Sequence, residues 1–286
     1  MRCADIPRLL GMVALLILAA CSSHSVAQNR SSLDEPLCPS WIEGILFDSY
    51  RNMANQHGRP EKSWPGVTFE EQTFSAQDGT EIYGYRAFAR TQEPEQQSAI
   101  VIVPGNAMLA AQLFAFAAYF ALQDFTAYVF DYRGYGGSTG IPRSNALIKD
   151  YREILSLVGR NGHLDTYIYA MSFGGIISLT ALADARSPAA LVLDGVPSTL
   201  PWYAFCPDSL DPVEALAHAP ARTLIISGTD DPVVSPDEMI PLRERAQELG
   251  MEARVVEHFS HPGLDDPETT LQRLGLVADF FRGSAP

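Results

Sequence analysis

A serine between an apolar segment and two glycines, near the middle of the chain, constrains the fold more than any other feature. Residues 166–170 are rich in β-branched and aromatic side chains and predict a buried strand. Ser172 follows, and the apolar residues 176–182 predict a buried helix. A tight turn between them needs small residues two positions before and after the serine, and Ala170 and Gly174 stand there. The pattern A-x-S-x-G therefore predicts a turn that lifts the serine hydroxyl above a sheet and points a helix N-terminus at this hydroxyl. The alternative is a turn that only connects the strand and the helix.

The segments around this turn alternate between buried strands and helices. Apolar runs predict strands at residues 98–103, 127–130, 190–194, 223–227 and 253–257. Helical spacing or composition predicts helices at residues 108–122, 145–158 and 270–281. Earlier in the chain, strands 68–74 and 81–88 flank Asp78-Gly79, a hairpin signal. This order predicts an α/β fold with a mostly parallel central sheet, helices on both faces and a short cap.

The N-terminus has the pattern of a bacterial lipoprotein. Residues 9–20 form an apolar run behind two arginines, shorter than the roughly 20 residues that span a bilayer and typical of a secretory signal peptide. The run ends in L-A-A-C, which resembles the lipobox, and the cysteine that would carry the lipid is Cys21. An ordinary signal peptide cut nearby is the alternative. Ser22 follows where an aspartate would retain a Gram-negative lipoprotein in the inner membrane, so we expect an outer-membrane anchor facing the periplasm.

Three regions are therefore expected along the chain. Residues 1–20 are the predicted lipoprotein signal peptide, 21–66 a tether and an N-terminal helix, and 67–286 the α/β domain. Polar residues 22–36 fit a flexible tether. Apolar side chains recur at helical spacing over residues 41–53 and predict an amphipathic helix that packs on the main domain.

Charge and cysteine content limit the partners. The formal net charge is -14, which argues against nucleic acid or an anionic surface as a partner because both require basic patches. Cys3 would leave with the signal peptide, so Cys38 and Cys206 remain as a pair in an oxidising compartment, either bridged or as two buried thiols. Cysteine and histidine nowhere have zinc-ligand spacing, so we expect no metal site.

The acid that would orient a catalytic base follows the strand at 223–227. A serine nucleophile needs a general base, and in this kind of fold the partners follow in the order serine, acid, histidine. Asp230 and Asp231 both stand after that strand. We favour Asp231, which lies three residues after Gly228 in the spacing G-x-x-D-x-x-V common in this fold, and keep Asp230 as the alternative. A carboxylate that only caps a helix near Pro236 is also open.

Two histidines follow the last strand, and either could be the base. His261 precedes Pro262-Gly263 in a loop that can curl back over the sheet, whereas His258 is expected to continue the strand. We therefore favour His261. The backbone N–H groups of Asn106, after strand 98–103, and of Phe173 are the predicted oxyanion donors.

Three motifs carry a resemblance to a known family. They are P-G-N-A at 104–107, D-Y-R-G-Y-G-G-S-T-G at 131–140 and Y-A-M-S-F-G-G at 169–175. Together they resemble the α/β-hydrolase superfamily over residues 67–282, and are most similar to its branch of lysophospholipases and protein depalmitoylases. Pro104 and Ala170 depart from the family pattern, which has histidine and glycine there. The resemblance implies that residues 131–140 hold a loop beside the site and take no part in the chemistry.

The resemblance also implies an activity, which is two-step acyl transfer from a small acyl ester or thioester to water. Ser172 would attack, His261 would take its proton, Asp231 would orient His261, and no cofactor or metal would be needed. The connection at residues 200–218, with Trp202, Tyr203 and Phe205, is expected to form an apolar lid. A serine peptidase of the same fold and a noncatalytic binding lipoprotein are the alternatives.

Overall fold

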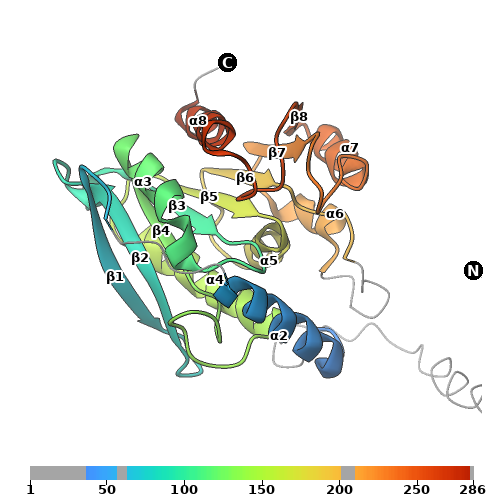
Figure 1. Cartoon of the computed structure of the whole chain (residues 1–286), viewed down its shortest axis with the longest axis horizontal. Coiled ribbons are helices and arrows are strands. Elements are labelled where there is room, and N and C mark those ends of the chain that lie inside the picture. Colours follow the sequence, from blue (N-terminus) through green and yellow to red (C-terminus); the bar gives the residue numbers. More distant parts are fainter. Residues whose placement is uncertain (1–36, 57–62, 201–209, 284–286) are drawn as a thin grey trace, which may run out of the picture. The chain divides into compact units, whose positions relative to one another are not determined.

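A central sheet of eight strands organises the part of the chain that the computed structural model describes, residues 37–56, 63–200 and 210–283. These residues lie in one compact unit, Leu33–Pro286 (Figure 1). The strands are β1 (Val67–Ser75), β2 (Glu81–Ala89), β3 (Ser98–Val103), β4 (Phe125–Phe130), β5 (Thr166–Met171), β6 (Ala190–Asp194), β7 (Thr223–Gly228) and β8 (Glu252–Val256). Their order is β1-β2-β4-β3-β5-β6-β7-β8. The hairpin β1–β2 and the β2–β4 pair are antiparallel, and the remaining pairs are parallel.

Helices cover both faces of this sheet. They are α2 (Ser40–Gln56), α3 (Phe114–Leu122), α4 (Ser144–Arg160), α5 (Phe173–Leu182), α6 (Pro212–Ala215), α7 (Ile240–Glu248) and α8 (Pro267–Arg282). Successive side chains of a strand point to opposite faces, so Ile100 and Ile102 pack with α3 and α8, while Val101 and Val103 pack with α4 and α5. The predicted α/β fold is confirmed, including its mostly parallel sheet.

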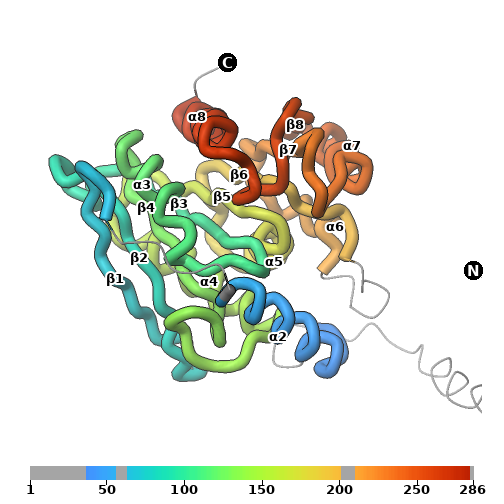
Figure 2. Tube along the Cα trace, in the orientation of Figure 1, coloured from blue at the N-terminus to red at the C-terminus, as the bar shows by residue number. Residues whose placement is uncertain are grey.

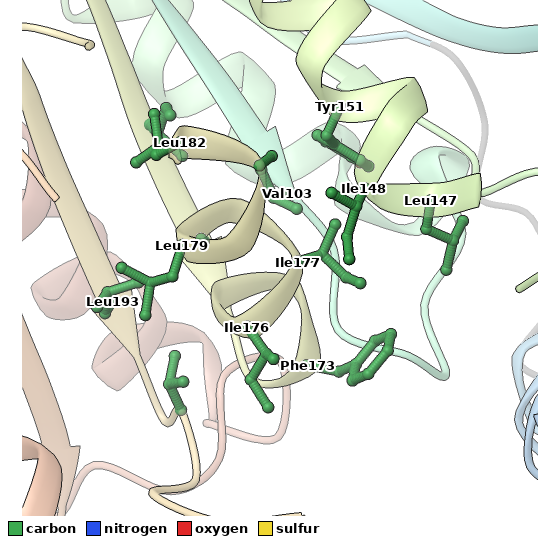
Figure 3. Packing of buried hydrophobic residues seen from close by; sticks show 14 of the residues in the cluster. Val103, Leu147, Ile148, Tyr151, Phe173, Ile176, Ile177, Leu179, Leu182 and Leu193 are labelled. Carbon is green, nitrogen blue, oxygen red and sulfur yellow. The ribbon is translucent and has the colours of Figure 1, made fainter. Parts of the chain in front are cut away.

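Helix α5, which follows Ser172, is buried along its whole length. Figure 3 shows it between the strand that carries Leu193 and helix α4, which carries Ile148 and Tyr151. A helix that is apolar on every side is stable only inside a core, because each face must be removed from water. Its N-terminus, beside Ser172, is therefore held rigidly in place by the packing around it.

The strand order places the loop after β5 at a reversal of the sheet. The chain passes from β3 to β4 on one side, and then crosses back to β5 on the other side of β3. At such a switch point the loops at the carboxyl ends of two neighbouring strands diverge and leave a crevice. Here these are the loop that begins at Pro104 and the turn at Ser172.

The N-terminal helix α2 packs on this domain, as the helical spacing predicts. The carboxylate of Glu43 accepts the backbone N–H of Ser144 at 3.1 Å, at the start of α4. The ring of Phe47 meets the ring of Phe173 edge to face, with centroids 6.0 Å apart. The tube in Figure 2 shows α2 running close to the beginnings of α4 and α5. Burial raises the pKa of the Glu43 carboxyl.

Several predicted elements differ from the structure at their ends, and two helices illustrate this. The predicted helix at 108–122 divides into a 3-10 helix, Ala110–Leu113, and α3. The last helix begins at Pro267 and not at residue 270, because the side chain of Asp266 accepts the N–H groups of Glu268 and Thr269 and caps it. These changes lengthen or divide helices and leave the order of elements as expected.

Several predictions fall on residues outside the described part. These are the signal peptide and tether, Cys21, Cys206 and the aromatic residues Trp202, Tyr203 and Phe205. Cys38 is buried and disulfide-bonded, and its partner cysteine lies outside the described residues, so the pairing with Cys206 stays a prediction. Within residues 37–56, 63–200 and 210–283, no helix is long and apolar enough to cross a membrane. The same residues contain no cluster of histidine, cysteine and acidic side chains suited to a metal ion.

Candidate active site

Ser172 lies in a strained turn between β5 and α5. Its backbone angles are φ 50° and ψ -126°, a conformation that a residue with a side chain rarely adopts. Gly174 makes the turn possible, because a Cβ atom there would lie 2.4 Å from the carbonyl oxygen of Pro104. The backbone N–H of Ser172 donates to the carbonyl of Asp194 at 2.9 Å, which ties the turn to the end of β6. The predicted turn is therefore present, with Ala170 buried in the strand before it.

A cavity of about 840 Å³ opens over this turn. Ser172 and His261 both line it, and so do the two predicted oxyanion residues, Asn106 and Phe173. Most of the remaining lining is apolar: Met53, Met108, Leu113, Phe116, Pro197, Leu200, Val233, Val234, Pro262 and Leu264. The polar or ionisable side chains among the others are those of Tyr50, Gln112, Thr199 and Glu238. The cavity therefore offers a mainly apolar surface next to Ser172.

Asp231 and His261 form a buried pair beside this cavity. Oδ2 of Asp231 lies 2.8 Å from Nδ1 of His261, and the two residues are 6% and 7% exposed. Oδ1 of Asp231 accepts the backbone N–H groups of Val233 and Val234, each at 2.8 Å. The carboxylate is thus fixed by its own loop on one oxygen and faces the imidazole with the other. This bond leaves Nε2 of His261 available for a proton from a neighbouring group.

The alternative histidine and aspartate lie on the surface. The side chain of His258 is 83% exposed and that of Asp230 57% exposed, with 3.5 Å between Nδ1 and Oδ2. His261 lies in the loop after β8, as expected, but the expectation that His258 continues the strand is wrong. Strand β8 ends at Val256, so no ladder holds His258, which instead occupies a turn with φ 64°. That turn points its side chain into solvent.

The loop after β3 approaches Ser172 closely. A Cβ atom on Gly105 would lie 3.5 Å from the Cβ of Ser172. Phe173 is the first residue of α5, where backbone N–H groups have no partner within the helix and the helix dipole is positive. Asn106 lies in the loop on the other side and is 8% exposed. The two predicted donors therefore flank the serine.

The motif at residues 131–140 holds this loop. The hydroxyl of Tyr132 donates to the carbonyl of Pro104 at 2.5 Å, and the hydroxyl of Tyr135 donates to Oδ1 of Asn106 at 2.9 Å. The carboxylate of Asp131 accepts the N–H of Ala110 at 2.7 Å. Burial raises the pKa of both tyrosines, so both hydroxyls keep their protons and act as donors. The motif thus contacts the loop through three separate side chains.

Two parts of the site have no clear signal in the sequence. Tyr50 and Met53 of α2 line the cavity, although the sequence predicts only that this helix packs on the domain. Beneath His261, Arg273 of α8 forms buried ion pairs with Asp194 and Asp265. The apolar stripe of α2 is a weak indication of the first feature. The second depends on residues far apart in the chain, which no local pattern identifies.

A strained serine turn at the switch point of a mostly parallel sheet, with a buried acid and histidine after later strands, is the architecture of the α/β-hydrolase fold. The chain has this fold. Residues 94–197 match the model of the Hydrolase_4 family, described as serine aminopeptidase, S33.

Comparisons with known proteins agree with this fold. The chain is 26% identical over 149 residues to the uncharacterized protein YfhR of Escherichia coli (strain K12), covering 50% of this chain and 51% of that protein. It is 28% identical over 209 residues to the alpha/beta hydrolase domain-containing protein aho-3 of Caenorhabditis elegans, covering 68% of this chain and 62% of that protein. The chain therefore spans about half to two thirds of the length of these relatives.

Among solved structures, the esterase Pf2001 of Pyrococcus furiosus is similar in fold. The two share 14% sequence identity and superpose with a TM-score of 0.61 over 79% of this chain and 98% of that chain. The fold and these similarities together support a hydrolase of the α/β-hydrolase superfamily.

Proposed function

We propose that the protein is a serine hydrolase that cleaves carboxylic ester or thioester bonds through an acyl-enzyme intermediate. One observation carries the proposal. The Asp231–His261 pair is buried at 2.8 Å, and His261 lines the same cavity as Ser172 in its strained turn. Buried acid and histidine side chains beside a serine are the arrangement that activates a hydroxyl as a nucleophile.

Each residue then has a defined role. His261 takes the proton of Ser172 through Nε2 as the hydroxyl oxygen attacks the carbonyl carbon. Asp231 fixes the tautomer of the imidazole through Nδ1 and stabilises the imidazolium that forms. The N–H groups of Asn106 and Phe173 stabilise the oxyanion. His261 returns the proton to the leaving group, and a water molecule, activated in the same way, then releases the acyl group.

The cavity favours substrates with an apolar group. Its lining is dominated by aliphatic, methionine and phenylalanine side chains, including Met108, Leu113 and Phe116. Burying apolar surface contributes roughly 25 cal/mol per Å², so each added methylene of an acyl chain strengthens binding while room remains. We therefore expect kcat/KM to rise with acyl length.

A serine peptidase of the same fold is the second candidate. The matching family model is described as serine aminopeptidase, S33, and the carboxylate residue Glu238 lines the cavity. A carboxylate there could pair with the α-ammonium group of a peptide. Glu238 already has one internal role, since its Oε2 accepts the N–H of Ser235 at 2.9 Å. We rank this candidate second because the lining is mainly apolar.

One substrate panel separates the two candidates. The purified protein is assayed with p-nitrophenyl esters of increasing chain length and with aminoacyl p-nitroanilides, with Ser172→Ala as the matched control. We expect ester hydrolysis that rises with chain length and is lost in Ser172→Ala. Faster hydrolysis of the anilides than of every ester, weakened by Glu238→Gln, would support the peptidase instead.

We also propose that Cys21 carries a lipid that anchors the protein in the bacterial outer membrane, facing the periplasm. The support is the apolar run at residues 9–20, which ends in L-A-A-C, and the serine that follows. Mass spectrometry of the mature N-terminus is expected to find an acylated Cys21. An N-terminus without an acyl group, or one that begins at another residue, would contradict the anchor.

A further inference from the structure

A cluster of buried charges lies directly beneath the loop that carries His261. The guanidinium of Arg273, on α8, contacts Oδ1 of Asp194 at 2.5 Å and Oδ2 of Asp265 at 2.6 Å. The side chains of all three residues are at most 1% exposed. None of the three lines the cavity, so the cluster does not touch a bound substrate.

On one side the cluster holds the serine turn. Asp194 is the last residue of β6, and its carbonyl oxygen accepts the N–H of Ser172 at 2.9 Å. The carboxylate of Asp194 accepts the hydroxyl of Tyr169 at 2.7 Å as well as the guanidinium. Asp194 is therefore fixed through its side chain while its backbone fixes the nucleophile.

On the other side the cluster holds the residue before His261. Nη2 of Arg273 donates to the carbonyl of Ser260 at 2.7 Å, and the N–H of Ser260 donates to Oδ1 of Asp265 at 2.7 Å. The guanidinium also stacks on the ring of Phe259, 4.3 Å from its centroid. The Arg273–Asp265 ion pair thus binds both the carbonyl and the N–H of Ser260. This fixes the position of the backbone at which His261 is attached.

The composition of the cluster favours a role beyond stability. Three buried charges are costly to desolvate, and a well-packed apolar group in the same space often stabilises a protein as well or better. A planar guanidinium has one property that an apolar group lacks. Its five donors, in a fixed fork, can hold several acceptors at set distances from one another.

We propose that Arg273 is a positioning residue that sets the separation of Ser172 and His261. Its rigid guanidinium binds two groups at once. One is the carboxylate of Asp194, whose backbone binds Ser172, and the other is the carbonyl of Ser260, which precedes His261. The inference rests on the proposed function of these two residues. Proton transfer from serine to histidine needs a heavy-atom distance of roughly 2.6–3.2 Å, so a small shift of either loop slows the reaction.

The test compares Arg273→Lys and Arg273→Met with Arg222→Met. Arg222 is a matched control, because it also anchors α8, through the carbonyl of Phe281 at 2.9 Å, but contacts neither Asp194 nor Ser260. For each variant kcat and KM are measured with one p-nitrophenyl ester, together with the rate at which a fluorophosphonate labels Ser172. Circular dichroism and Tm establish that each variant is folded at the assay temperature.

We expect kcat and the labelling rate to fall about 100-fold in Arg273→Met and about tenfold in Arg273→Lys, since displacements near 1 Å have effects of this size. KM should stay within about twofold of the wild-type value, because the cluster does not contact substrate. Arg222→Met should lower Tm without changing kcat. If the two Arg273 variants do not fold, Asp265→Asn, which loosens the same loop, should lower kcat about tenfold.

The outcomes also separate this inference from the proposed function. A wild type that hydrolyses no ester and is not labelled at Ser172 contradicts the proposed function, and the inference falls with it. An active wild type with folded Arg273 variants of unchanged kcat contradicts the inference alone. The inference is also contradicted if Arg222→Met lowers kcat as much as the Arg273 variants do, at the same loss of Tm. If the Arg273 variants do not fold, an unchanged kcat in Asp265→Asn contradicts it.

Discussion

The two sides of the site are held in place by different means. On the oxyanion side, tyrosine hydroxyls hold the loop after β3: Tyr132 donates to the carbonyl of Pro104, and Tyr135 donates to Oδ1 of Asn106. On the base side, the buried ions Asp194, Asp265 and Arg273 fix the loop before His261. The two tyrosines lie within about thirty residues, along the chain, of the loop that they hold. The buried ions join strand β6 to helix α8, which are far apart in the chain.

This difference determines how each side responds to change. A neutral hydrogen bond contributes about 0.5–1.5 kcal/mol net, so the loss of one on the oxyanion side leaves the rest of that loop in place. Removing one partner of a buried ion pair leaves an uncompensated charge and costs about 3–5 kcal/mol. We therefore expect the base side to be the more sensitive of the two.

The largest effect is expected at the base itself. His261→Ala should lower kcat about 10⁴-fold, because no other group then accepts the proton of Ser172. His258→Ala is the matched control, since its exposed side chain lies in the neighbouring turn. Steady-state kinetics of both folded variants with one ester measure the difference. Full activity of His261→Ala together with loss in His258→Ala would reverse the assignment.

A smaller effect is expected from the tyrosine that holds the oxyanion loop. Tyr135→Phe should lower kcat about tenfold, less than the loss of an oxyanion donor itself, because Asn106 keeps its backbone N–H but loses a side-chain contact. The control is Tyr151→Phe, which removes a buried hydroxyl that has no hydrogen-bond partner in the described part of the chain. Equal kcat values for the two variants would show that Tyr135 does not position this loop.

The smallest effect is expected at the outer end of the same motif. The hydrogen bond from Arg133 to Asp78, 2.7 Å long, lowers the pKa of Asp78 from 3.8 to about 2. A folded-state pKa below the unfolded value stabilises the protein above pH 3.8, and this contribution is lost as the pH falls toward 2. Because the side chain of Asp78 is 55% exposed, the contribution is at most about 1 kcal/mol.

Urea denaturation of the wild type and Asp78→Asn across this pH interval measures the contribution. The difference in the free energy of unfolding should shrink as the pH falls, while kcat at neutral pH stays at its wild-type value. A difference that is constant down to pH 2 would contradict the linkage. A loss of kcat would show that the outer end of the motif also influences catalysis.

The features that sequence predicted well are those set by local patterns. The predicted bounds of strands β3 and β6 are those that the structure shows, because a short apolar run is typical of a strand buried on both faces and ends where polar or turn residues begin. The turn at Ser172 was predicted because its tightness requires Gly174. Chain order and the spacing from Gly228 indicate Asp231, and the position of His261 in a loop favours it over His258. The structure brings the two residues into contact.

The features that the sequence does not predict depend on contacts between residues far apart in the chain. Arg273 and Asp194 are separated by 79 positions, and an arginine in a helix normally indicates an exposed face. The exposure of His258 depends on where β8 ends, and the ends of elements are the part of a fold that local patterns define least. In the same way, the role of α2 in lining the cavity follows from how it packs, which its sequence does not specify.

The most direct test of the proposed function is active-site labelling of Ser172. The folded wild-type protein, Ser172→Ala and His261→Ala are incubated with a labelled fluorophosphonate, and the modified peptide is identified by mass spectrometry. We expect one label on the wild type, at Ser172, no label on Ser172→Ala and a greatly slowed reaction in His261→Ala, because the reagent reacts only with an activated serine. A folded wild type that takes up no label, which is the result expected of a noncatalytic binding lipoprotein, would contradict the proposed function. So would a wild type labelled at another serine.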